Sequence, residues 1–131
     1  MALVHSTPKH PEEWNYLFDT RDAIENFNYF QTRLCFIGHS HRPVAFFHEN
    51  ERYWIVYDQT LLIKSDMRCI INVGSVGQPR DGDARACYAI YDEDEGEFRY
   101  IRVPYDVEKT QEKMRKANLP DYLIQRLFVG R

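Results

Sequence analysis

The sequence has no long apolar segment and no paired-cysteine motif. No run approaches the roughly 18 apolar residues that a membrane-spanning helix needs. The first ten residues, MALVHSTPKH, have neither the basic start nor the apolar core of a secretion signal. The three cysteines, Cys35, Cys69 and Cys87, lie inside apolar runs and form no CxxC pair. An odd number of cysteines without a secretion signal predicts buried, reduced thiols and a cytoplasmic protein.

The sequence also has no basic stripe, no internal repeat and no linker. Its net charge is −3 at neutral pH, and acidic and basic residues are interspersed along the chain. Binding to a nucleic-acid backbone needs clustered lysine and arginine, so that function is not expected. The one acidic run, residues 92–97, is broken by Gly96 and predicts a solvated turn. A length of 131 residues predicts one domain, or part of one.

Aromatic residues are plentiful, at 15% of the chain, which favours β-structure. The apolar start at residues 2–4 predicts the end of a strand that enters a loop. Further strands are predicted where short segments are rich in β-branched or aromatic residues, at 34–37, 53–57, 61–63, 69–73, 87–91 and 98–103. The last two flank the turn at 92–97 and predict a hairpin.

Helices are predicted before and after these strands in the sequence. Residues 11–28 are expected to be helical in one or two pieces, with Asp19 or Thr20 as a cap. After Asp106 the apolar residues recur at helical spacing, and Pro120 opens a final short helix that ends at Gly130. This order predicts an α/β (alpha+beta) layered domain with mixed or antiparallel strand pairing.

Three predicted strand ends carry polar groups that a core does not need. They read VHSTP at 4–8, GHSHRP at 38–43 and NVGSVGQPRDGD at 72–83. His39 and His41 can direct their rings toward one locus or two neighbouring ones, and neutral imidazole is the commonest protein ligand of borderline divalent metals. Taken alone, the pair is equally explained as two partly exposed loop histidines. His5, at another strand end, favours the metal interpretation.

The third stretch allows two interpretations. Its three glycines within nine residues are typical of a plain turn. Alternatively, a glycine loop after a strand can offer backbone N–H groups to an anion, and Arg80 can add a guanidinium. The spacing from Gly74 to Gly77 is not that of a Walker motif, because the Lys-Ser of that motif is missing.

Together these stretches resemble the C-terminal half of the calcineurin-like metallophosphoesterases, in their small bacterial and archaeal phosphodiesterase-like branch. That family has VHGxP, GHTHxP and NPGSVGQPRDGD in the same order and at similar intervals. The tail RVPYDVEKTQEKMRKANLP is similar to the family's closing strand and helix. The resemblance implies that residues 1–131 are the C-terminal portion of a single domain. It implies part of a four-layer α-β-β-α sandwich with mixed sheets, and metal-dependent hydrolysis of phosphoesters.

The resemblance also implies roles for individual residues. His5 and His39 would bind one metal ion, and His41 would bind its neighbour. The implied cofactors are divalent ions, manganese first, with iron, nickel or zinc as alternatives. The implied substrate is a phosphoester small molecule. The candidate phosphate or substrate contacts are Arg80, Asn72 and Ser75.

The chain departs from the family pattern mildly at three positions and seriously at its beginning. Ser6 stands for a glycine, Ser40 for a threonine and Val73 for a proline. The family's DxH, GD and GNHD segments do not occur, because the Gly82-Asp83 pair belongs to the third motif. The remaining metal ligands, the bridging aspartate and the histidine that assists the leaving group are therefore missing. Three neutral imidazoles cannot offset the repulsion between two divalent ions. We expect one tightly bound ion or two weak ones, a dinuclear centre only with the missing half, and little activity in isolation.

The missing segments predict exposed apolar sheet surface and unpaired strand edges. We therefore expect self-association, pairing with a separately encoded N-terminal half, or a chain that is part of a longer gene product. The alternative function is a non-catalytic module that keeps the fold for protein–protein interaction.

Overall fold

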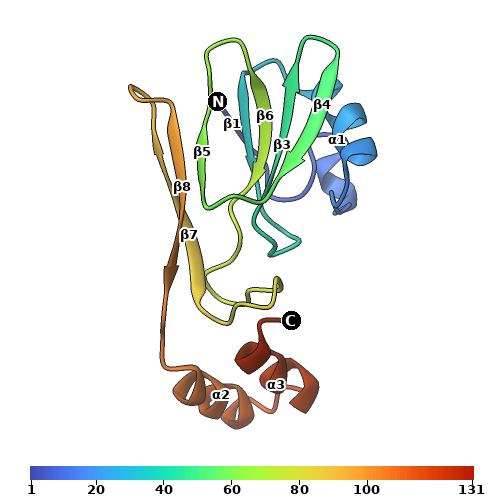
Figure 1. The fold of residues 1–131 in the computed structure, drawn as a ribbon. Helices are drawn as coiled ribbons and strands as arrows, with labels where there is room; N and C mark the ends of the chain where they lie inside the picture. Colours follow the sequence, from blue (N-terminus) through green and yellow to red (C-terminus); the bar gives the residue numbers. More distant parts are fainter.

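The computed structural model describes residues 1–131 and contains two β-sheets (Figure 1). One helix lies near the start of the chain and two lie at its end. The larger sheet has the strand order β1-β2-β6-β3-β4. Strands β1, β2 and β6 are parallel, and β3 is antiparallel to β6 and β4. The bounds of its strands are β1 (Ala2–Leu3), β2 (Leu34–Ile37), β3 (Val44–Glu49), β4 (Arg52–Val56) and β6 (Arg68–Asn72). The predicted mixed pairing is confirmed.

The smaller sheet is antiparallel, with the order β5-β8-β7. It consists of β5 (Thr60–Leu62), β7 (Ala86–Asp92) and β8 (Glu97–Val103). The predicted hairpin is formed by β7 and β8. Asp92 begins its turn by accepting hydrogen bonds from the N–H groups of Asp94 and Glu95, both at 3.1 Å. Gly96 follows with φ of 65°, a conformation that glycine adopts without steric cost.

Two apolar cores hold the layers together. One lies between the sheets and includes Phe47, Cys69 and Phe98. The other lies on the opposite face of the larger sheet, where Phe27 and Leu17 pack with residues of β2, β3 and β6. Neighbouring residues of β3 enter different cores because successive strand side chains point to opposite faces of the sheet.

Strand β3 was not predicted, although it lies in the middle of the larger sheet. Residues Val44 to Phe47 are all buried, which explains their continuous apolar run. The run directly follows the GHSHRP motif, which ends at Pro43. No turn residues therefore separate the motif from the run and mark the start of a strand. A short apolar run without alternation is a weak signal for a strand.

The prediction of helix over residues 11–28 was only partly right. The helical pieces are the 3-10 turn η1 (Pro11–Glu13), α1 (Thr20–Asn26) and the 3-10 turn η2 (Phe27–Tyr29). Asp19 caps α1 by accepting from the N–H of Asp22 at 3.0 Å, as predicted. Residues 14–18 are not helical. Trp14 has φ of 57°, which ends the turn before it.

The last two helices are α2 (Val107–Lys116) and α3 (Asp121–Val129). They lie beyond the end of the β7–β8 hairpin rather than across the outer face of the smaller sheet (Figure 1). The chain thus forms three of the four layers that the resemblance implied: α1, the larger sheet and the smaller sheet. No helix combines the length and the apolar composition needed to cross a membrane.

The C-terminal helix is attached to the loop at 78–83. The N–H of Gly82 donates to the carbonyl oxygen of Gly130 at 2.9 Å. Gly130 has φ of 64°, and a Cβ atom there would lie 2.7 Å from the backbone of Asp83. Only glycine lets the two backbones approach so closely at this backbone conformation.

Candidate functional site

The three polar motifs meet at the carboxyl ends of parallel strands. His5 follows β1, Gly38 and His39 follow β2, and β6 ends at Asn72. The N–H of Gly38 donates to the carbonyl oxygen of His5 at 3.0 Å, which joins the first two motifs. In open sheets this edge is the usual position of a ligand site, because loops from neighbouring parallel strands emerge there together.

Asn72 is the residue that holds the motifs in place. Its side chain is 0% exposed. Its Nδ2 donates to the carbonyl oxygen of Gly38 and to Oγ of Ser40, and its Oδ1 accepts from the N–H of Gly74. The side chain therefore makes three hydrogen bonds within the protein and positions the loops around it. Its role as a substrate contact stays a prediction.

The serine between the two histidines turns inward. Ser40 is only 4% exposed and accepts from Asn72 Nδ2 at 2.9 Å. His39 and His41 have φ of 61° and 58°, in the left-handed region, and both stay partly exposed. That conformation costs about 1 kcal/mol per residue, although histidine adopts it more often than most residues. The loop thus buries the small residue and leaves both imidazoles near the surface.

His5 and His39 lie side by side. Their ring centroids are 5.2 Å apart and their planes are inclined by 62°. Nε2 of His39 donates to the carbonyl oxygen of Trp14 at 2.9 Å. A carbonyl only accepts, so Nε2 carries the proton and Nδ1 has the free lone pair. The sequence-predicted pair of ligands to one ion is therefore brought together by the fold.

His41 is held separately by the third motif. Its Nδ1 donates to the carbonyl oxygen of Gln78 at 2.8 Å, which leaves the lone pair on Nε2. Burial lowers the pKa of His41, against the Gln78 hydrogen bond, and Arg80, His39 and His5 lower it further. The imidazole is thus kept neutral and oriented by a carbonyl, as metal-binding histidines usually are.

Three aromatic side chains from the segment before α1 surround these histidines. Tyr16 stacks on His39 with ring centroids 4.3 Å apart, and Phe18 stacks on Tyr16 at 5.2 Å. Trp14 lies 5.2 Å from His5. The alternation of aromatic residues at 14, 16 and 18 is the period of an extended chain and could have identified this segment. This segment was instead predicted to be part of a helix.

The third motif is mainly a turn that packs on β7. Ser75 accepts from the N–H of Gln78 at 3.0 Å through its Oγ. Gly74 has φ of 79°, and a Cβ atom there would lie 2.8 Å from Sγ of Cys87. Arg80 donates to Oε1 of Gln78 through two nitrogens, and its own N–H donates to the carbonyl oxygen of His41 at 3.1 Å. The motif therefore places Arg80 next to the second histidine of GHSHRP.

The histidines fit part of a metal site. Neutral imidazoles are suitable donors for divalent transition metals. No group of three or more His, Cys, Asp or Glu side chains in the structure is arranged to hold an ion, so no carboxylate completes the His5–His39 pair. The assignment of His5, His39 and His41 as metal ligands stays a prediction.

Comparisons with known proteins support the resemblance drawn from the motifs. No family model matches the chain. All of the chain matches an uncharacterized protein of Methanocaldococcus jannaschii, with 44% identity over 132 residues and 52% of that protein covered. The crystal structure of a metallophosphoesterase from Sphaerobacter thermophilus matches 98% of the chain with 42% identity and a TM-score of 0.84. The chain matches the C-terminal half of that metallophosphoesterase.

A more distant structure shares the fold of this chain. The crystal structure of a hypothetical protein from Pyrococcus horikoshii OT3 matches 98% of the chain with a TM-score of 0.71 at 17% identity, which shows the shared fold alone. The chain covers 54% of the metallophosphoesterase and 46% of the hypothetical protein. It thus spans about half the length of the relatives that it matches. The resemblance inferred from the motifs is confirmed, and so is the mixed α/β fold class.

Proposed function

We propose that residues 1–131 are the C-terminal portion of a metallophosphoesterase domain that hydrolyses phosphoesters with divalent metal ions. The observation that carries the proposal is the meeting of His5, His39 and His41 at the carboxyl ends of parallel strands, in a chain 42% identical to a metallophosphoesterase. Divalent ions bound here, with manganese expected first, would supply a hydroxide nucleophile and polarise the phosphoryl oxygens.

His39 and His41 each have one ring nitrogen available for this role. The hydrogen bond to Trp14 leaves Nδ1 of His39 free, and the hydrogen bond to Gln78 leaves Nε2 of His41 free. We assign His5 and His39 to one ion and His41 to its neighbour. The partner carbonyls keep the rings oriented and select the tautomer, as in other metal sites.

Two residues of the third motif are suited to hold the phosphoryl group. Arg80 offers a planar guanidinium, which binds phosphate oxygens in a bidentate manner. Ser75 accepts a hydrogen bond through Oγ and still has its own O–H to donate. Donors at such positions stabilise the negative charge that develops on the phosphoryl oxygens.

A complete site needs the rest of the metallophosphoesterase fold, on the same polypeptide or on a separate one. A mainly apolar pocket of about 450 Å³ opens beside His5, between the larger and smaller sheets. Its lining includes Phe36 and Phe98, and Leu3 at its rim is 76% exposed. β1 and β7, each at one edge of its sheet, have an unpaired edge. Unpaired edges next to an apolar pocket are suited to receive further strands of the same fold.

Hydrolysis of an aryl phosphodiester with Mn²⁺ tests the proposal. We expect the chain to act when combined with the N-terminal half of its relative, and to have little activity alone. His39→Ala should lower the rate by about a hundredfold or more, because it removes an ion ligand. His10→Ala is the matched control, since His10 is an exposed histidine that pairs with Glu12. Equal rates for His39→Ala and the wild type would contradict the assignment.

The second candidate function is a non-catalytic module for protein–protein interaction, and the open apolar pocket beside His5 favours it. The same experiment separates the two. A stable complex with the N-terminal half that hydrolyses no phosphodiester at any Mn²⁺ concentration would support the interaction module. Association of the chain with itself, measured by analytical ultracentrifugation, would indicate a second copy as the partner of the interaction module.

A further inference from the structure

A second cavity lies on the other side of the GHSHRP loop and is strongly basic. It has a volume of about 680 Å³ and is bounded by that loop, the loop at 78–83 and the C-terminal helix. Four of its lining residues are arginines, namely Arg42, Arg80, Arg126 and Arg131. We call this cavity the arginine pocket.

The four arginines come from distant parts of the chain. Arg42 follows His41, Arg80 belongs to the third motif, and Arg126 lies on α3. The hydrogen bond between Gly82 and Gly130 brings the end of α3 to the loop at 78–83. The protein as a whole has a net charge of −3, so this local concentration of positive charge does not follow from its composition.

None of the four guanidinium groups forms an ion pair with a side-chain carboxylate. Arg42 donates to the carbonyl oxygen of Arg80 at 3.0 Å, Arg80 donates to Gln78, and Arg126 donates to the main-chain oxygen of Arg131. Asp81 also lines the cavity, but its carboxylate is paired with Arg102. If a terminal carboxylate at Arg131 is counted, three positive charges remain in excess. Like charges held together repel, and a bound anion relieves that repulsion.

The size and charge of the pocket indicate what kind of anion it takes. A guanidinium matches the oxygens of a phosphate in a bidentate manner, and one phosphate dianion is neutralised by two such groups. Four guanidinium groups around about 680 Å³ exceed the needs of a single phosphate. Linked phosphate groups supply both the extra charge and the extra length.

The pocket adjoins the proposed hydrolytic site. The N–H of Arg80 donates to the carbonyl oxygen of His41 at 3.1 Å, and Arg42 is the next residue in the chain. We propose that the arginine pocket binds a chain of two or more linked phosphate groups. Resting on the proposed phosphoesterase function, this means that the substrate is an oligophosphate ester whose reacting phosphate lies at the histidines.

Calorimetric titration with tripolyphosphate tests the pocket. The chain is titrated without divalent metal, in EDTA and at low salt, so that no hydrolysis is needed for a signal. We expect one saturable site that binds tripolyphosphate at least about tenfold more tightly than orthophosphate. Arg126→Gln should weaken the binding about tenfold, and Arg126→Gln with Arg131→Gln about a hundredfold. Raising the salt concentration should weaken it further.

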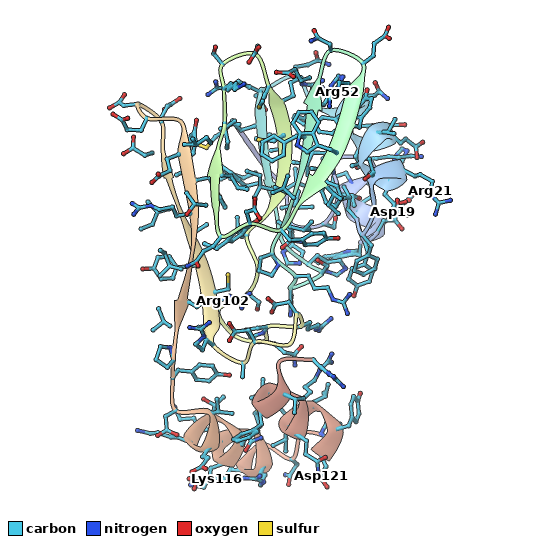
Figure 2. The ribbon with its side chains drawn as sticks, in the orientation of Figure 1. Asp19, Arg21, Arg52, Arg102, Lys116 and Asp121 are labelled. Carbon is cyan, nitrogen blue, oxygen red and sulfur yellow. The ribbon has the colours of Figure 1, made fainter.

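The matched control is Arg52→Gln. Arg52 is an exposed arginine without an ion pair at the β3–β4 turn, at the far end of the molecule from α2 and α3 (Figure 2). It should bind tripolyphosphate like the wild type. Circular dichroism checks that each variant is folded, and Arg131→Gln alone, at the exposed end of the chain, replaces Arg126→Gln if that variant unfolds. No saturable binding, or equal weakening by Arg52→Gln and Arg126→Gln, would overturn the pocket.

The result of the tripolyphosphate titration does not depend on the result of the phosphodiester hydrolysis experiment. Specific tripolyphosphate binding without Mn²⁺-dependent hydrolysis would support the pocket and overturn the proposed function. Hydrolysis of the aryl phosphodiester without tripolyphosphate binding would overturn the pocket and leave the proposed function standing.

Discussion

At the scale of single residues, the site depends on two small polar side chains that are completely or almost completely buried. Asn72 and Ser40 form hydrogen bonds with each other and with main-chain groups of the surrounding loops, in place of hydrogen bonds to water. Buried polar groups are tolerated when every partner is satisfied, and they then define one arrangement of the chain. The hydrogen bonds of this buried pair hold the loop that carries His39 and His41 in place.

We expect Asn72→Ala to lower the free energy of unfolding by about 2–4 kcal/mol. The change removes three hydrogen bonds, to the carbonyl oxygen of Gly38, Oγ of Ser40 and the N–H of Gly74, and it leaves the Gly74 N–H without a partner. Urea denaturation measures the loss. Asn28→Ala, at an exposed asparagine with one long hydrogen bond of 3.5 Å, should stay within about 0.5 kcal/mol of the wild type. Equal effects of the two changes would contradict the role of Asn72.

At the scale of elements, the parallel arrangement of β1, β2 and β6 brings three separate motifs to one edge of the sheet. The C-terminal helices make a different contribution, because they carry arginines to the far side of the same loops. The end of α3 makes close backbone contact with the loop at 78–83 at Gly130. A side chain at this position therefore tests how α3 is held.

Gly130→Ala should detach the end of α3 from the loop at 78–83. Its φ of 64° and the backbone of Asp83, 2.7 Å from the new Cβ, make alanine costly by about 1–3 kcal/mol. Hydrogen exchange of the Gly82 amide, which donates to Gly130, should become faster. Gly77→Ala is the control, because no atom lies within 4 Å of a Cβ there. Unchanged exchange in Gly130→Ala would show that other contacts hold the helix.

At the scale of the whole molecule, the larger sheet separates two cores, and each contains a cysteine that is 0% exposed. Cys69 lies in the core between the sheets and Cys35 in the core under α1. The two thiols therefore report on the integrity of both sides of the sheet. Their reactivity measures unfolding of the protein as a whole.

Burial raises the pKa of Cys35 to about 11 and that of Cys69 to about 12. At pH 8 both thiols should react with a disulfide reagent only after urea denaturation, because the thiolate is the nucleophile. Unfolded thiols lose their protons near pH 9, before the buried ones do. Stability from these residues is thus complete below pH 9 and falls as the pH rises toward 11. The urea midpoint should fall less steeply with rising pH in the double variant Cys35→Ala, Cys69→Ala than in the wild type. Rapid reaction of the native thiols at pH 8 would contradict their burial.

The sequence predicted the features that depend on local patterns. Alternating or β-branched runs identified most strands, Asp19 was recognised as a cap, and the acidic run at 92–97 was recognised as a turn. It failed at β3, whose uniform apolar run has no period, and at residues 14–18, where an extended aromatic segment was placed in a helix. Both errors arise because burial on two faces, and packing against distant loops, override local preference.

The sequence by itself determined the motifs, the family and the residue types that can bind metal and phosphate, because these are carried by short stretches of chain. Only the tertiary structure decided which of them come together. It placed His5 beside His39, buried Asn72 as a support and gathered four arginines into one pocket. The physical reason is that strand pairing and helix docking join segments far apart in the chain, and no local pattern specifies which segments those are.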